Sequence, residues 1–397
     1  MSDPVDTDAE IRAVLAALLT TGVGLGRTRL RAAVEAFGSA AAAAVAPDWS
    51  RVPGVGERHA AAVPRALAAT LASGAVDRQL EAADRLGAEA VPLDRLPLAL
   101  QRTPDPPPLL FVRGRFVAED ALSVGVVGSR ACSAYGGEQA ARFAAHAADA
   151  GMTVVSGGAY GVDAAAHRAV LRRAELGGRG RTVAVLGSGL GRPYPAAHRP
   201  MFEEIVDRGG VVCSELPVDA PPTKQTFPAR NRIISGLSLG VLVVEAAERS
   251  GASITARLAA EDHGRVVMAV PGRVDTPHAA GCHRMIREGA TLVTRPPEML
   301  DALGDAGRLL QEELEARGEA GGELRGQAAP EPIAVATLSP AQKKLVAALP
   351  APGGGGAGVD ELAEATGLAA ASLFGELTVL ELRGVVEKGP AGFRRRR

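Results

Sequence analysis

The first part of the chain has the hydrophobic pattern of helices. Apolar residues recur three and four positions apart between Ile11 and Leu19, which places them on one face of a helix. A glycine-interrupted turn at residues 52–59 has the form of a helix-hairpin-helix, whose free backbone N–H groups can hold a phosphate. A plain tight turn in a small helical bundle explains the same residues equally well. We therefore expect a helical domain over residues 1–75.

The middle of the chain, residues 76–302, alternates β-branched runs with glycine-containing turns and helices. A proline-rich segment at residues 103–108 leads into this region through a first strand. Near-continuous apolar strands that alternate with helices are typical of a parallel sheet covered on both faces. The pattern predicts an α/β fold with an extended Rossmann-like sheet. The further strand runs lie at residues 124–127, 153–155, 182–186, 211–213, 241–244 and 266–270.

The last part of the chain changes character twice. Residues 303–337 are rich in Glu, Gly, Ala, Arg and Pro, which predicts a flexible linker. Residues 338–397 show helix-turn-helix spacing followed by two short strands, which predicts a winged-helix domain. Its recognition helix offers Ser372 and Thr378 but no basic residue before Arg383. Contact with a protein therefore explains this domain at least as well as binding in a DNA groove.

Composition excludes several classes of protein. The chain has 397 residues and a formal net charge of −1, so no overall basic field attracts nucleic acid and any such binding must be local. Cys132, Cys213 and Cys282 are far apart, which indicates neither a disulfide framework nor a zinc site. The amino terminus has no apolar run of signal-peptide form, and no stretch reaches the length of a membrane span. We therefore expect a soluble cytoplasmic protein.

A basic segment at residues 223–238 stands out against this neutral background. It contains Lys224, which is the sole lysine before Lys343, together with two arginines, an asparagine and an aromatic ring. Clustered cations repel one another unless a polyanion lies among them, and the face of Phe227 can stack on a base. The segment indicates a nucleic-acid or nucleotide contact, although a solvated, charged helix start is the common alternative.

The turns that follow the strands provide the other candidate contacts. Ligands of parallel α/β sheets bind at the carboxyl ends of the strands, where small residues let the backbone approach and helix N-termini favour phosphate. All three tyrosines of this aromatic-poor chain lie in or beside these turns. No phosphate-binding loop of Walker type occurs, and the first turn lacks the Gly-x-Gly-x-x-Gly pattern, so we expect no cofactor.

Candidate catalytic groups are few. Asp163 and His167 are four positions apart on one predicted helix face, where they form either an acid–base or metal-binding pair or, more commonly, a helix cap beside a packed histidine. Glu215 and Glu245 each end a strand, but nearby arginines can neutralise them. Ser250 has no obvious histidine partner. We expect no catalytic residue and no metal site.

Taken in order, these motifs closely resemble the DNA-processing protein DprA (Smf) family over about 170 residues of the central domain. The end domains also fit, since the family often has a SAM-like or helix-hairpin-helix domain before the Rossmann domain and a winged helix after it. The motifs are Val126-Val127-Gly-Ser-Arg130, Ser156-Gly157-x-Ala159-x-Gly161-Val-Asp163-x-x-Ala-His167, Tyr194-Pro195, Ser214-Glu215, Phe227-Pro228-x-Arg230-Asn231-Arg232-Ile-Ile-x-Gly-Leu-Ser238, Val244-Glu245-Ala246, Ser250-Gly251-x-x-x-Thr255-Ala256 and Val270-Pro271-Gly272.

The resemblance implies a mediator without known catalysis, which binds single-stranded DNA and loads the RecA recombinase in natural transformation or recombination. It also implies a homodimer formed through the Rossmann domain. Implied DNA-binding residues are Gly128, Ser129, Arg130, Lys224, Phe227, Arg230, Asn231 and Arg232. Residues expected to line the pocket are Ser156, Gly157, Tyr160, Gly161, Glu245, Ser250, Gly251 and Thr255.

Two other classes compete with this interpretation. A nucleotide-hydrolysing enzyme can occupy a related Rossmann scaffold, but such enzymes carry a Pro-Gly-Gly-x-Gly-Thr-x-x-Glu loop that this sequence lacks. A winged-helix repressor whose Rossmann part senses a nucleotide is disfavoured by the weak recognition helix. Base-specific binding of duplex DNA would revive that second class.

Overall fold

The computed structural model describes residues 7–305, 338–351, 356–368, 370–382, 385–389 and 392–396. The chain divides into two compact units: the first comprises Met1–Phe116 and Val183–Ile233, and the second comprises Val117–Thr182 and Ile234–Arg397. A nine-stranded, mostly parallel sheet runs in the order β1-β2-β6-β5-β4-β3-β7-β8-β9, which confirms the predicted α/β class. The domain limits at residues 75, 302 and 337 stay predictions, and most of the expected linker lies outside the described residues.

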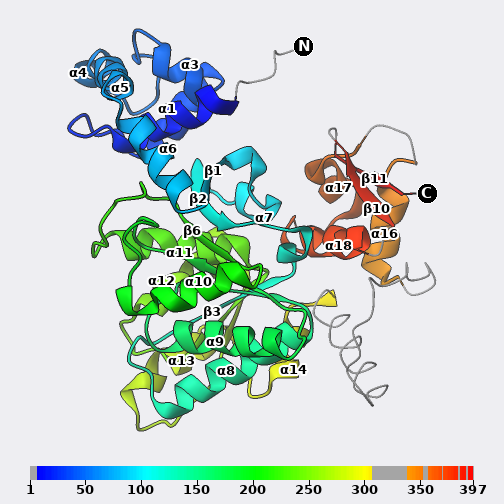
Figure 1. The fold of residues 1–397 in the computed structure, drawn as a ribbon. Coiled ribbons are helices and arrows are strands. Elements are labelled where there is room, and N and C mark those ends of the chain that lie inside the picture. The colour runs from blue at the N-terminus through cyan, green and yellow to red at the C-terminus, as the bar shows by residue number, and fades with distance from the viewer. Residues whose placement is uncertain are drawn as a thin grey trace. The chain divides into compact units, whose positions relative to one another are not determined.

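The first unit begins with a cluster of helices, as the periodicity predicts (Figure 1). Trp49 is fully buried in this cluster and its indole Nε1 donates to the carbonyl of Ala43 over 3.0 Å. The carboxylate of Glu10 accepts the backbone N–H groups of Ala40 and Ala41 at 2.8 and 2.9 Å, which satisfies the free amides of a helix start. The helices are α1 (Thr7–Leu19), α2 (Arg27–Phe37), α3 (Ala40–Val45), α4 (Glu57–Ala60), α5 (Ala62–Ala72) and α6 (Ala75–Arg85).

The strands of the first unit differ from the all-parallel prediction. β5 and β6 are parallel, but β2 runs antiparallel to both β6 and β1. The segment between β1 and β2 contains only short helical turns, and antiparallel strands need no long crossover helix. The elements are β1 (Ala88–Pro92), α7 (Leu98–Gln101), β2 (Leu109–Gly114), β5 (Thr182–Val185), α10 (Arg199–Asp207), β6 (Val211–Ser214) and α11 (Thr226–Leu237), of which α11 begins in this unit.

The second unit contains the parallel strands that the sequence predicts. β3 pairs in parallel with β4 and β7, and β8 pairs in parallel with β7 and β9. Helices α8 and α9 pack together and against β3 and β4, where Phe143 and Val154 are fully buried. The elements are β3 (Ser123–Gly128), α8 (Ala134–Asp149), β4 (Thr153–Ser156), α9 (Val162–Glu175), β7 (Gly240–Val244), α12 (Gly251–Arg257), β8 (Val266–Ala269), α13 (Pro277–Arg287), β9 (Thr291–Leu292) and α14 (Pro296–Ala302).

The carboxyl-terminal part has winged-helix architecture, as predicted. Three helices pack on one another and an antiparallel two-stranded ribbon follows, with Lys388 opposite Phe393. The side chains of Ser372, Thr378 and Arg383 lie outside the described residues. Binding in a DNA groove and binding to a protein therefore both stay predictions for this domain. The elements are α16 (Pro340–Ala348), α17 (Val359–Thr366), α18 (Ala370–Leu382), β10 (Val386–Gly389) and β11 (Gly392–Arg395).

Candidate nucleic-acid interface

The turn after β3 is held by backbone contacts in the second unit. The N–H of Ser129 donates to the carbonyl of Glu245 over 2.7 Å, and the carbonyl of Ser129 accepts from Val162 N–H over 3.1 Å. A Cβ at Gly128 would lie 1.9 Å from the carbonyl oxygen of Val244, so only glycine fits. The turn therefore presents the exposed Arg130 from a fixed backbone.

The loop after β4 lies directly against this turn. Gly161 has φ +74°, and a Cβ there would stand 2.2 Å from the carbonyl oxygen of Ser129. The hydroxyl of Ser156 donates to the carbonyl of Val126 over 2.6 Å, which fastens the loop to β3. Tyr160 is 46% exposed at the tip of the loop. The residues predicted from these two turns are thus brought together within one unit, with Arg130 and Tyr160 as its exposed side chains.

Asp163 and His167 have structural contacts. The carboxylate of Asp163 accepts the N–H groups of Gly157 and Ala159 at 3.1 and 3.3 Å, so it fixes the loop after β4. The ring of His167 is fully buried with Nδ1 2.7 Å from the Thr182 hydroxyl. Because that hydroxyl already donates to a backbone carbonyl, Nδ1 of His167 is the donor. The packed histidine matches the structural alternative, but α9 has no side-chain cap, so Asp163 holds the preceding loop and does not cap the helix.

Glu245 ends β7 and reaches the start of α8. Its carboxylate accepts the N–H of Ser133 over 2.8 Å and also the hydroxyl of that residue. It is buried, and its φ of +52° makes it the one non-glycine residue with positive φ in the part of the chain that the structure describes. A carboxylate is stabilised at a helix N-terminus, which offsets the backbone strain. Glu245 therefore positions the loops beside Ser129.

The three remaining predicted pocket residues lie at the start of α12. The hydroxyl of Ser250 accepts the N–H of Ser253 over 3.3 Å and so caps this helix. Gly251 is exposed, whereas Thr255 is buried with its hydroxyl 3.5 Å from the carbonyl of Gly251. The cap is thus a structural contact, and a DNA contact through these residues stays a prediction.

The first unit contains the basic segment. Lys224 is exposed, and Thr226 secures the start of α11 because its hydroxyl donates to the carbonyl of Gly187 over 2.6 Å. A Cβ at Gly187 would lie 2.7 Å from the ring of Phe227, so the ring can pack there only because residue 187 is a glycine. The rings of Phe227 and Tyr194 are 5.6 Å apart at 56°, and Tyr194 is 40% exposed. This arrangement gives an aromatic pair with Tyr194 exposed and Phe227 half-buried, and the exposed Lys224 stands three residues before Phe227 in the chain.

Arg230, Asn231 and Arg232 are buried in α11, unlike Lys224. The guanidinium of Arg230 donates to the carbonyl of Val185. Arg232 is 6% exposed and forms ion pairs with Glu215 and Asp105. Direct DNA contact by these three residues stays a prediction, because Arg230 and Arg232 form these hydrogen bonds and ion pairs with the protein itself. The sequence singled out Tyr194 as one of three tyrosines in or beside the turns, and the structure pairs its ring with that of Phe227.

The cysteines are poor nucleophiles. Burial raises the pKa of Cys213 to about 12 and that of Cys282 to about 11. Burial, and next the charge of Glu245, also raise the pKa of Cys132. A thiol must ionise before it can attack, so these raised pKa values disfavour all three as nucleophiles at neutral pH. Across the described ranges, no group of three or more His, Cys, Asp or Glu side chains is arranged to hold a metal ion.

Helices in the described part of the chain are too short or too polar to cross a membrane.

Comparison with known proteins covers both the sheet and the winged helix. Residues 92–304 match the sequence model of DNA recombination-mediator protein A, and residues 328–392 match that of the DprA winged helix domain. The Smf protein of Escherichia coli is 46% identical over 207 residues, which cover 52% of this chain and 54% of that protein. A DprA-named relative from Mycobacterium tuberculosis is 42% identical over 262 residues, or 66% of this chain and 61% of the relative.

The chain thus spans less than two thirds of the length of these relatives. Among solved structures, the X-ray structure of DNA processing protein A from Streptococcus pneumoniae superposes with a TM-score of 0.61 at 30% identity, covering 74% of this chain and 97% of that one. The family match extends over more than half of the sequence and includes the turns at Gly128, Gly161 and Gly187. The chain belongs to the DNA recombination-mediator protein A (DprA/Smf) family.

Proposed function

We propose that this protein binds single-stranded DNA, protects it, and loads the RecA recombinase onto it during natural transformation or DNA recombination. The observation that carries the proposal is the Tyr194–Phe227 pair in the first unit, together with the exposed Lys224 three residues before Phe227 in the chain. An exposed aromatic face with a nearby cation suits a strand whose bases are unpaired, because every base can stack and every phosphate attracts a cation. The family description as a recombination mediator supports the same role.

Arg130 supplies a second cationic contact in the proposal, from the second unit. It is exposed on a turn whose backbone is fixed by Gly128, Gly161 and Glu245, so binding a phosphate has to order the side chain but not the backbone. Each neutralised phosphate adds to the salt dependence of binding. The expected function needs no catalytic residue and no cofactor.

Partners and location belong to the same proposal. We propose that the chain acts in the cytoplasm as a homodimer formed through its Rossmann domain, and that RecA is its protein partner. Multi-angle light scattering of the purified chain tests the dimer. RecA filament formation on DNA coated with single-strand-binding protein tests the loading, and absence of any acceleration would contradict it.

The first experiment is fluorescence-anisotropy binding of labelled single-stranded and double-stranded DNA across a salt series. Wild type and Lys224→Ala are compared, and the expected result is a strong single-strand preference that the variant loses. Preference for duplex, or binding indifferent to Lys224, would contradict the proposal. Nucleotide-hydrolysis assays would then test the competing enzyme class.

A further inference from the structure

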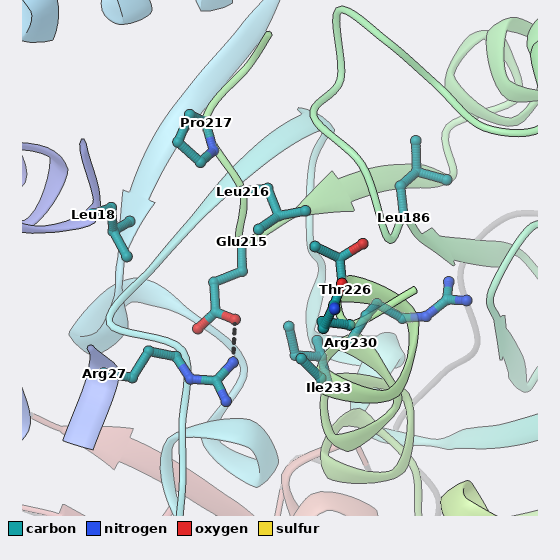
Figure 2. A pocket seen from close by; sticks show the side chains of 11 residues that line it. Leu18, Arg27, Leu186, Glu215, Leu216, Pro217, Thr226, Arg230 and Ile233 are labelled. Atoms are coloured by element: carbon teal, nitrogen blue, oxygen red, sulfur yellow. Dashed lines mark hydrogen bonds and ion pairs between the residues drawn. The ribbon is translucent and has the colours of Figure 1, made fainter. Parts of the chain in front are cut away.

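A pocket of about 310 Å³ opens in the first unit at the carboxyl ends of β5 and β6. Leu186 follows β5, Glu215 follows β6, and the first turns of α11 contribute Thr226 and Ile233. In Figure 2 Glu215 and Arg27 meet on one side of the pocket, and Thr226 and Ile233 stand on the other. This end of a parallel strand pair is where ligands of α/β sheets bind.

The size and walls of the pocket suit a small flat ring. Its volume is at the lower end of the range of about 300–1,000 Å³ that is typical of small-molecule sites. Leu18, Leu186 and Ile233 provide apolar surface from α1, the turn after β5, and α11. Apolar walls with a few polar groups are the usual design of a site that recognises an aromatic heterocycle. The polar residues that line this pocket are Arg27, Glu215, Gln225, Thr226 and Arg230. A nucleobase fits such a space, whereas a longer piece of strand does not.

Arg27 and Glu215, two of the three charged residues that line the pocket, form an ion pair; the third is Arg230. Nη1 of Arg27 lies 2.9 Å from Oε2 of Glu215, while Oε1 of Glu215 pairs with Arg232. Each carboxylate oxygen has two lone pairs, so pairing with two guanidinium groups leaves acceptor capacity. The Arg27 side chain is 30% exposed and that of Glu215 is 9% exposed, so the carboxylate is held in place. The pocket therefore offers an acceptor and a donor side by side.

We propose that this pocket receives a nucleobase, with preference for guanine. The Watson–Crick edge of guanine carries two adjacent N–H donors for Glu215 and, beside them, the O6 acceptor for Arg27. The proposal rests on the proposed DNA binding, because Gln225 and Thr226 line the pocket and stand between Lys224 and Phe227 in the chain. A base of a bound strand and a free nucleoside present the same edge, and the experiment separates these two sources.

The test uses the full chain and nucleosides, which lack the phosphate that Lys224 and Arg130 attract. Deoxyguanosine and thymidine are titrated and followed by saturation-transfer NMR. A well-placed bidentate contact discriminates by about 1–3 kcal/mol, so deoxyguanosine is expected to bind about tenfold more tightly than thymidine. Ala229→Leu, which fills the pocket, should abolish this preference. Ala69→Leu, at an exposed position of α5, is the matched control and should keep it.

Labelled oligothymidine with and without one central guanine provides the second arm. Tighter binding of the guanine-containing strand, lost in Ala229→Leu, identifies a base of the strand as the ligand. A preference for free deoxyguanosine without a strand effect identifies a free nucleoside. Equal binding of both nucleosides to wild type, or a preference that survives Ala229→Leu, would show that Arg27 and Glu215 only join the helices to the sheet.

The failure of this proposal is distinguishable from failure of the proposed function. Lys224→Ala should weaken oligothymidine binding but leave the nucleoside preference intact. If Ala229→Leu does not fold, Gln225→Trp provides a second variant, because Gln225 is exposed and precedes α11. A tryptophan there covers the pocket mouth without removing a charge, and it should likewise abolish the preference.

Discussion

Glu245 accepts the backbone N–H of Ser133 over 2.8 Å, although the two residues are 112 positions apart. Ser133 is the N-cap of α8, and its own hydroxyl also accepts the N–H of Gly136 over 3.1 Å. The contact ties the end of β7 to the start of α8, at the same place where the carbonyl of Glu245 holds Ser129. The strained residue Glu245 thus connects two loops, the one that contains Ser129 and the one that leads into α8.

The first prediction concerns the space around this carboxylate. A Cβ at Gly136 would lie 2.3 Å from Oε2 of Glu245, so Gly136→Ala should displace the carboxylate and remove the cap. Loss of such a cap costs about 1–2 kcal/mol of unfolding free energy. Gly137→Ala is the matched control, because the nearest atom to its Cβ is 3.8 Å away. The control should be neutral or stabilising by up to about 1 kcal/mol. Urea unfolding of both variants measures the difference, and equal stability would contradict the role of Glu245.

The second prediction concerns the two turns that meet at Ser129. Gly161→Ala would combine strain at positive φ with an overlap with the carbonyl oxygen of Ser129, 2.2 Å from the new Cβ. Because strain of about 1–3 kcal/mol adds to that overlap, we expect a total loss above about 3 kcal/mol. Gly177 also has positive φ but has open space around it, so Gly177→Ala should cost about 1–2 kcal/mol. Thermal unfolding ranks the variants, and a larger loss for Gly177→Ala would contradict the close approach.

The sequence predicted the central strands because each is a continuous, mostly β-branched apolar run. β1 and β9 gave no such signal. β1 reads Ala-Glu-Ala-Val-Pro, whose residue types mostly have low strand propensity, and β9 has only two residues. Both pair at the edges of the sheet, where their neighbours rather than their own residues fix them. The antiparallel direction of β2 also depends on its pairing with β6, which composition does not reveal.

The sequence predicted those parts of the candidate site where the backbone has room only for glycine. It did not predict which of the basic side chains are buried and which are exposed. Gly128 and Gly161 stand out in the sequence because their turns accept no side chain. Arg232 and Lys224 look alike in the sequence, yet one is buried and the other exposed. The difference comes from Asp105, which is 127 positions from Arg232, and from Glu215 after β6. Such distant partners leave no local pattern.

The third prediction separates a basic residue that stabilises the fold, Arg232, from one that is proposed to bind DNA, Lys224. Arg232→Met removes one guanidinium from Glu215 and Asp105, while Arg27 stays paired with both carboxylates. We therefore expect a loss of about 1–3 kcal/mol, less than for a buried charge left without a partner. Lys224→Met at the exposed position should change stability by less than about 0.5 kcal/mol. Urea unfolding and DNA binding are measured on the same samples. A stable Arg232→Met protein that loses DNA binding would instead identify Arg232 as a direct contact.

The fourth prediction is a pH dependence at the start of α14. Glu298 accepts the N–H of Thr294 over 2.7 Å and pairs with Arg295 at 3.0 Å. These contacts, the Thr294 N–H foremost, lower the pKa of Glu298 from 4.5 to about 2. Because the folded-state pKa is lowered, the stability that Glu298 contributes is present above pH 4.5 and is lost as the pH falls through about 2.

Glu298→Gln should therefore lower the Tm at neutral pH, and the difference from wild type should shrink as the pH falls towards 2. Differential scanning calorimetry over a pH series measures it. Glu138→Gln, at an exposed position of α8, is the control for losing one negative charge. A Tm difference that stays constant from neutral to acidic pH would show that the Glu298 carboxylate is not held in its charged form.

The fifth prediction concerns how Phe227 contributes to DNA binding. Its ring lies 5.6 Å from that of Tyr194 and fills the space left by Gly187. Phe227→Leu keeps an apolar side chain at this place but removes the stacking face, which is worth about 1–3 kcal/mol per stacked base. Affinity for single-stranded DNA should thus fall about tenfold. Stacking releases few counterions, so the slope of log K against log salt should stay unchanged, whereas Lys224→Ala should reduce it by about 1. Phe116→Leu, at a half-buried aromatic elsewhere in the first unit, controls for loss of a ring and should bind normally.

If Phe227→Leu instead lowered the slope of log K against log salt as Lys224→Ala does, the ring would act by holding Lys224 in place rather than by stacking.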